Sequence, residues 1–172
     1  MKSKELKGKT VVSIKDGSKL GQVDDVLVDK EDLRIVALHI KGHGEDALIP
    51  FEKVKNATGE VITVPAASAA QRPRSQEETA SLASLGEMTK LKVIDEEGTF
   101  LGVVQSVEVD PRSGEILELQ TQKATAMGFG REQYTIAASE VTSVGAEMVV
   151  VQAPESLSAN ADEPFYLTKG DA

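Results

Sequence analysis

The chain has 172 residues, no cysteine and a formal net charge of −9, and aromatic residues make up only 3% of it. These values fit one ordinary domain or two small ones with aliphatic cores, and they exclude disulfides, thiolate metal sites and cysteine nucleophiles. The acidic balance argues against direct nucleic-acid binding, and no apolar run approaches the roughly 20 residues that span a bilayer, so we expect a cytoplasmic protein without a membrane span.

The first part of the chain shows strand patterns. Four lysines lie within Met1–Lys9, and we interpret this short basic segment as a solvated terminus rather than a site for an anionic partner. Apolar residues then alternate with a period of two, as half-buried strands require. The predicted strands are Thr10–Ile14, Ile35–Ile40, Ala47–Ile49 and Val61–Val64, with a turn at Asp29–Asp32.

A stretch rich in alanine, serine and proline follows, over 66–86, and lacks any strand pattern. Such a composition is typical of a linker. Ser75 and Glu78 have the spacing of a capping box, which predicts a short helix from about Gln76 to Leu85.

Strand patterns return after the linker. The predicted strands are Leu91–Ile94, Leu101–Val109, Ile116–Thr121, Tyr134–Ile136 and Met148–Val151. Between the second and third of these, Asp110-Pro111-Arg112-Ser113-Gly114 suits a type I turn with a following bulge, so a hairpin is expected there. The composition shifts again after Ala153, and we expect a flexible tail over 154–172 in which Phe165-Tyr166-Leu167 could still dock on a barrel.

Self-comparison reveals an internal repeat. The coinciding residues are Gly17, Leu20, Gly21 and Val23 in the first copy and Gly98, Leu101, Gly102 and Val104 in the second. The second copy carries a short insertion between Ile116 and Tyr134, near the two glycines of a longer hairpin loop. The repeat predicts an all-β chain: a first small barrel over 1–65, the linker over 66–86 and a second barrel over 87–153, each barrel with five or six short antiparallel strands.

The repeated pattern Gly-x-x-Leu-Gly-x-Val-x-x-Val, followed by a turn and a second hairpin strand, resembles the PRC-barrel family. In the first copy, Leu48-Ile49-Pro50-Phe51-Glu52-Lys53-Val54 is also similar to the family's apolar-proline-aromatic segment, whereas the second copy lacks the proline and the aromatic residue. The family's barrel occurs in the cytoplasmic part of the photosynthetic reaction-centre H subunit and in a ribosomal RNA maturation factor. The resemblance implies a protein-interaction barrel with no catalytic residues to carry over.

His39 and His43 are candidate metal ligands with acidic residues nearby. Residues four apart in a strand lie about 13 Å from one another, too far for one ion, although Gly42 and Gly44 could fold the chain back. We therefore favour a hairpin loop over a metal site. The four repeated glycines are better explained by a tight turn and a strand bend than by a ligand.

These patterns favour a non-enzymatic module, because the sequence has no Gly-x-Ser-x-Gly elbow and no assembled nucleophile and base. The leading hypothesis is an adaptor or scaffold that has no cofactor and binds an unknown protein partner. Such an adaptor would fit a role in RNA processing or in assembly of a larger complex. The sequence is also compatible with a homodimer. Candidate contacts are Pro50 and Phe51 in the first copy, and Met127, Phe129 and Arg131 in the second. For Phe51, plugging a barrel end is the competing interpretation. The alternative function is a small-ligand or metal sensor, with a pocket at the junction of the two copies or at the histidines.

Overall fold

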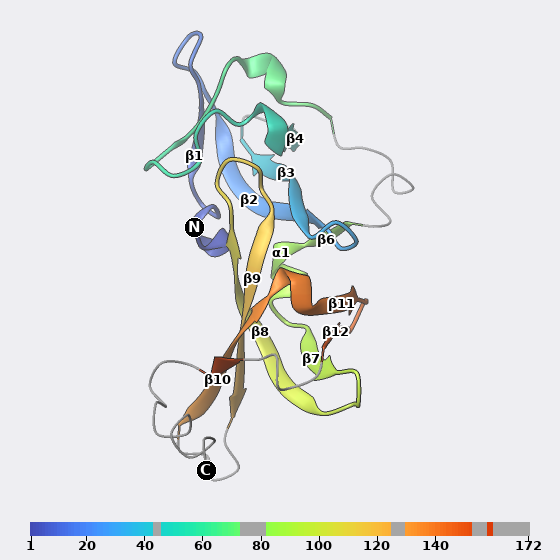
Figure 1. Cartoon of the computed structure of the whole chain (residues 1–172). Helices are drawn as coiled ribbons and strands as arrows, with labels where there is room; N and C mark the ends of the chain where they lie inside the picture. Colours follow the sequence, from blue (N-terminus) through green and yellow to red (C-terminus); the bar gives the residue numbers. More distant parts are fainter. Residues whose placement is uncertain (43–45, 73–81, 125–129, 153–157, 160–172) are drawn as a thin grey trace.

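The structure, a computed structural model, describes residues 1–42, 46–72, 82–124, 130–152 and 158–159. Strands dominate both copies, and the described residues include a single short α-helix, α1 (Leu85–Met88). Figure 1 shows the first copy above the second, with the strand β6 (Leu82–Ser84) and α1 between them. The all-β fold class expected from the sequence is confirmed.

The first copy forms a sheet with the strand order β4-β3-β2-β1-β5. Its strands are β1 (Thr10–Ser13), β2 (Lys19–Asp29), β3 (Arg34–Lys41), β4 (Ala47–Pro50) and β5 (Ile62–Val64). Neighbouring strands are antiparallel except β5, which runs parallel to β1. The strands predicted for this copy are all present.

The second copy repeats this arrangement with two additional edge strands, in the order β11-β12-β7-β8-β9-β10-β13. Its strands are β7 (Lys92–Asp95), β8 (Phe100–Val109), β9 (Ile116–Ala124), β10 (Arg131–Ala137), β11 (Val141–Val144), β12 (Met148–Val151) and β13 (Ser158–Ala159). The sequence did not predict β11 or β13. Strand β13 lies within the segment expected to be a flexible tail, and residues 160–172, including Phe165-Tyr166-Leu167, lie outside the described residues.

A short 3-10 turn connects the two edges of each sheet and closes it into a barrel. In the first copy, η2 (Phe51–Lys53) leads from β4 to Lys55, whose backbone amide donates to the carbonyl of Thr63 in β5 at 2.8 Å. In the second copy, η4 (Ala138–Glu140) leads from β10 to β11, which pairs with β12. The closed path leaves little exposed sheet edge, as expected of a small barrel.

The linker helix starts later than predicted. Where the range Gln76–Leu85 is described, Leu82–Ser84 forms strand β6, which pairs with β2, and α1 begins only at Leu85. Ser84 and Glu87 form a capping box, in which the Glu87 amide donates to the Ser84 hydroxyl at 3.1 Å; Ser75 and Glu78 lie outside the described residues. This pair has the same spacing as Ser75 and Glu78, so the spacing alone could not distinguish the two positions.

The buried residues of both copies form one core. Along the long strands alternate side chains point inward: Val26 and Val28 are at most 1% exposed, as are Val107 and Val109. The same cluster includes Leu85 and Met88 of α1 and residues of both sheets. Because this cluster is continuous, the two barrels pack directly against each other. Two further 3-10 turns complete the described chain, η1 (Ser3–Glu5) and η3 (Ala67–Ala69).

Candidate functional site

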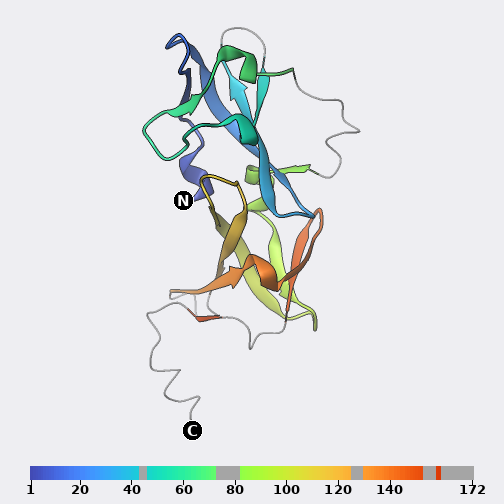
Figure 2. The same ribbon diagram turned by 45° about the horizontal axis from the view of Figure 1, so that its top comes forward.

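The two barrels are joined by the turns of their longest hairpins. The backbone amide of Ile35 donates to the carbonyl of Gly114 at 2.8 Å, and that of Ile116 donates to the carbonyl of Leu33 at 2.9 Å. In the repeat, Leu33 corresponds to Gly114 and Ile35 to Ile116. Each copy therefore donates one hydrogen bond to the other at equivalent positions, which is the pattern of a two-fold interface within one chain. Figure 2 shows the tip of each hairpin beside the other copy.

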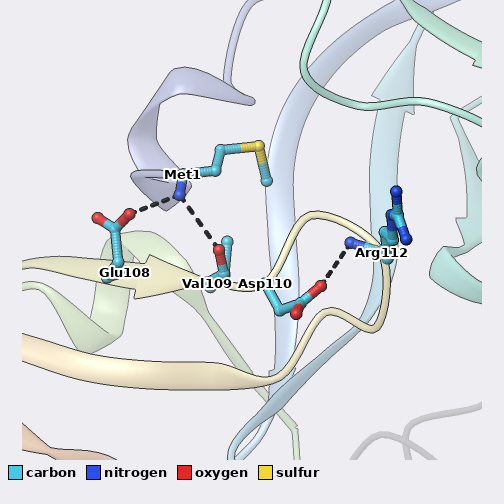
Figure 3. A network of polar contacts seen from close by, with 5 residues as sticks. All are labelled: Met1, Glu108, Val109, Asp110 and Arg112. Atoms are coloured by element: carbon cyan, nitrogen blue, oxygen red, sulfur yellow. Dashed lines mark hydrogen bonds and ion pairs between the residues drawn. The ribbon is translucent and has the colours of Figure 1, made fainter.

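The segment that precedes each barrel packs on the other barrel. Before the first barrel, the amino group of Met1 contacts the carboxylate of Glu108 and donates to the carbonyl of Val109 at 3.3 Å (Figure 3). The carbonyl of Met1 also accepts from the amide of Val109 at 2.8 Å. Before the second barrel, β6 pairs with β2 and places Ala83 opposite Val28. Val28 and Val109 are equivalent in the repeat, so each leading segment contacts the same strand position on the other barrel. These reciprocal contacts fix the orientation of the two barrels.

Asp110 fixes the turn at the centre of this joint. Its carboxylate accepts hydrogen bonds from the backbone amides of Arg112 at 2.8 Å and Ser113 at 3.1 Å (Figure 3 shows the first). The bonds from Ser113 and Arg112 hold the pKa of Asp110 below its ordinary value of 3.8, because they stabilise the charged carboxylate. The charged side chain thus supports the turn that carries Gly114.

This pKa shift predicts an acid-sensitive joint. A carboxylate with a lowered pKa in the folded state stabilises the fold above its ordinary pKa, and that stabilisation is lost as the pH falls through the folded pKa. We expect the melting temperature to fall more steeply below about pH 4 in the wild type than in Asp110→Asn, which keeps a hydrogen-bond acceptor but does not titrate. Melting curves between pH 6 and pH 2 measure the difference; parallel profiles would contradict this role of Asp110.

A pocket of about 340 Å³ lies beside the joint, between the first barrel, the linker and the second barrel's turn. Its floor is apolar and its rim carries the charged residues Arg34, Glu52 and Arg72. The full lining is Leu27, Arg34, Ile35, Val36, Ala37, Leu48, Pro50, Phe51, Glu52, Gln71, Arg72, Leu82 and Ser113. Six separate segments contribute to it, all from the first barrel and the linker except Ser113, through which the second barrel's turn completes the lining.

A second, more open hollow lies at the equivalent place on the other side of the joint. It is lined by Asp32, Leu33, Arg34, Glu115, Ile116, Ala138 and Ser139. Here Glu115 takes the place of Arg34, Asp32 that of Ser113, and Ala138 that of Phe51. The repeat has therefore produced two related hollows that share Arg34: the first also contains Arg72 and Phe51, whereas the second contains Asp32 and Glu115 and lacks the aromatic ring.

Comparison with known families decides what these barrels are. The sequence profile described as "PRC-barrel domain" matches residues 1–71 and again residues 83–158. The chain belongs to the PRC-barrel domain family. The two matched ranges are the two copies found by self-comparison, so the resemblance noted in the sequence is confirmed as a tandem pair. No curated protein sequence shows significant similarity to the chain.

The structure places the predicted contacts of the first PRC barrel in the pocket. Pro50 lines the pocket and is half-buried. Phe51 is only 3% exposed, belongs to the core and lies against Gly114 of the second barrel, so it is a packing residue at the joint rather than an exposed contact. Met127 and Phe129 lie outside the described residues, and of Arg131 only the backbone, in β10, is described.

His39 lies in β3 of the first PRC barrel, between two carboxylates. Its Nδ1 is 3.3 Å from the carboxylate of Asp24 and its Nε2 is 3.3 Å from that of Asp46. The two carboxylates occupy opposite sides of the ring and do not converge on one point. No cluster of three metal-ligating side chains occurs in the parts of the chain that are described, and His43 lies outside them.

The motif residues of both PRC barrels serve the fold. Val23, Leu101 and Val104 are at most 6% exposed, and Leu20 is partly buried against the same core. Gly21 and Gly102 lie where the long strands β2 and β8 approach the neighbouring strand's backbone, whereas Gly17 and Gly98 lie in open turns. None of these residues lines the junction pocket.

Sequence reasoning missed the charged rim of the pocket. Arg34, Arg72 and Ser113 lie in a hairpin, the linker and the second barrel's turn, so no local motif connects them. One signal was available: Arg34 and Glu115 occupy equivalent positions in the repeat but carry opposite charge. The basic N-terminal segment lies elsewhere; Lys2, Lys4 and Lys7 are exposed, and Lys9 donates to the carbonyl of Ala57 at 2.9 Å. No helix in the described part of the chain has the length and apolar character to cross a membrane.

Proposed function

We propose that the chain is a non-enzymatic protein-interaction module whose two PRC barrels act as one body and bind a partner protein at the junction pocket. The observation that carries the proposal is the composition of the pocket: the first barrel and the linker form most of it, Ser113 of the second barrel completes it, and its apolar floor has a charged rim. Rigid scaffolds commonly present binding residues on their turns and loops. An adaptor built this way recognises its partner only when both barrels are folded and docked.

The residues at the pocket support binding rather than catalysis. Its titratable side chains are Arg34, Arg72 and Glu52, all of them exposed. Efficient general acid or base catalysis needs a group whose pKa lies near the working pH, held next to a reacting atom. Exposed arginines and a single exposed glutamate supply charge complementarity but not that chemistry.

A small-ligand sensor is the second candidate, and the size of the junction pocket favours it. A volume of about 340 Å³ lies at the lower end of the range of roughly 300–1,000 Å³ that ligand pockets occupy. A ligand that binds only the folded chain raises its melting temperature by mass action. The sensor therefore predicts a thermal shift with a specific small molecule, and the adaptor does not.

The test is capture of a partner by the tagged full-length chain from extract of its source cells, followed by amide hydrogen exchange of the purified complex. We expect slower exchange in the complex at segments 34–37, 48–52 and 110–114 together, since these surround the pocket from both barrels. A complex whose protection falls only on β5 or β12, far from the pocket lining, would refute the proposed site. An empty capture combined with a ligand-induced thermal shift would replace the adaptor with the sensor.

A further inference from the structure

Resting on the proposed function, we propose that the junction pocket binds an extended partner segment in which an acidic residue adjoins a large apolar one. The carboxylate lies at the rim, with Arg34 and Arg72, and the apolar side chain lies on the floor, over Ala37 and Leu48. This inference names the chemical groups that the junction pocket binds, which membership of the family does not specify.

The rim has an excess of positive charge in an otherwise acidic chain. Arg34 and Arg72 outnumber Glu52 there, while the whole chain carries a formal charge of −9. Arg34 donates one guanidinium hydrogen bond to the carbonyl of Ser113 at 3.2 Å, which orients the group and leaves further donors for a ligand. Arg72 forms no ion pair with any residue that the structure describes. Oriented guanidinium groups are the preferred partners of carboxylates.

Arg34 belongs to the joint as well as to the rim of the pocket. Glu115 occupies the equivalent position in the repeat and lies opposite Arg34 in an isolated antiparallel bridge, between the two backbone hydrogen bonds that join the barrels. The second hollow is lined by Asp32, Glu115 and Arg34 itself, and has Ala138 where the pocket has Phe51. Arg72 lines the pocket but not that hollow, so it is the basic residue that distinguishes the two.

The exposed rim of the pocket favours side chains of a larger partner over an enclosed small molecule. Small-molecule sites bury most of the ligand surface, roughly 70–90% or more. Here four rim residues are exposed, Arg34, Glu52, Gln71 and Arg72, while Ala37, Leu48 and Phe51 are at most 9% exposed. The apolar floor accommodates a large apolar side chain, and the exposed rim leaves room for the backbone that carries it.

The edge of β4 argues for recognition by side chains rather than by strand addition. At Leu48 both outward backbone groups are already used: its amide donates to Gln71 at 2.8 Å, and its carbonyl accepts from Gln71 at 2.7 Å. The next outward-facing position on this edge is Pro50, which has no amide hydrogen to donate. A partner segment therefore gains little from backbone pairing here, and charge and apolar burial must supply its affinity.

The test is a titration of the ¹⁵N-labelled full-length chain with N-acetyl-Leu-Glu-amide, followed by amide chemical shifts. N-acetyl-Leu-Gln-amide is the matched neutral probe, and 3-phenylpropionate tests a free small carboxylate. We expect saturable shifts at the pocket amides with millimolar affinity, and at least about tenfold weaker binding of the Gln probe, because a charge-assisted hydrogen bond is lost. Equal binding of both dipeptides would refute the carboxylate site, and binding of 3-phenylpropionate alone would assign the pocket to a small ligand instead.

Arginine variants locate the carboxylate. Arg72→Gln removes a side chain with no ion pair to any described residue, so the fold should remain intact; Lys15→Gln makes a similar charge change on an exposed residue away from the pocket. We expect Arg72→Gln to weaken binding of the Glu probe about tenfold and Lys15→Gln to leave it unchanged. Unchanged binding in Arg72→Gln would overturn the inference. A hydrogen-exchange footprint at the junction without dipeptide binding would leave the proposed function standing and remove only this ligand chemistry.

Discussion

Gly102→Ala is expected to destabilise the chain by about 3–5 kcal/mol, a large part of the stability of a small domain. Gly102 has a φ of +130°, and a Cβ placed there would lie 2.5 Å from the carbonyl oxygen and 2.7 Å from the carbonyl carbon of Gln122. These are backbone atoms of β9, so relief requires separating β8 from β9 at the position where the repeat motif pairs them. The expected cost combines the strained backbone with overpacking.

Gly98→Ala is the matched control. Gly98 also has a positive φ, +88°, but a Cβ there meets nothing within 4 Å. The control therefore measures the backbone strain alone, about 1–2 kcal/mol. Urea unfolding of both variants, compared at equal m-value, isolates the contribution of the close approach. Similar losses in the two variants would show that Gly102 is required only for its backbone conformation.

The strands were predictable because burial on one face imposes a period of two. Val26 and Val28 in β2, like Val107 and Val109 in β8, alternate with more exposed residues, and the structure buries all four. The linker was less predictable because it offers no such period. Strand β6 pairs only three residues with β2, which is too short for a period to emerge, and the capping box at Ser84 has an equally good competitor at Ser75.

The candidate site was predictable only in part. The proline and aromatic residue of the first copy pointed to the region of the proposed pocket, since Pro50 and Phe51 both line it. The orientation of Phe51 toward the core, however, depends on the second barrel, whose turn lies against its ring. Arg72 and Ser113 could not be predicted as pocket residues, because both lie far from Phe51 in the sequence. Ser113 reaches the pocket only through the docking of the two copies.

The docking itself follows from the repeat once its turns are compared. Leu33 and Gly114 are equivalent, both have a positive φ, and both give their carbonyl to an isoleucine amide of the other copy. Leu33 adopts φ +49° despite its side chain, and it packs against the common core. We infer that the joint requires this backbone conformation in both copies, since a non-glycine residue rarely adopts it without compensation from packing.

Gly114→Ala is therefore expected to weaken the joint, with a loss of about 2–5 kcal/mol in the free energy of unfolding. A Cβ at Gly114 would lie 2.9 Å from Cδ2 of Phe51 and 3.0 Å from the carbonyl oxygen of Ile35, both in the first barrel. The backbone conformation at φ +78° adds strain. Because the two copies share one core, the melting transition of the whole chain should shift, as calorimetry measures.

A double-mutant cycle with Phe51→Leu tests whether the lost stability arises between the barrels. Leucine lacks the ring atom that meets the new Cβ, so Phe51→Leu should cost less in the Gly114→Ala background than in the wild type. A coupling of about 1 kcal/mol or more would place the ring of one barrel against the turn of the other in solution. Strict additivity would mean that the two residues do not touch. That result would contradict the docked arrangement of the barrels and the pocket beside it.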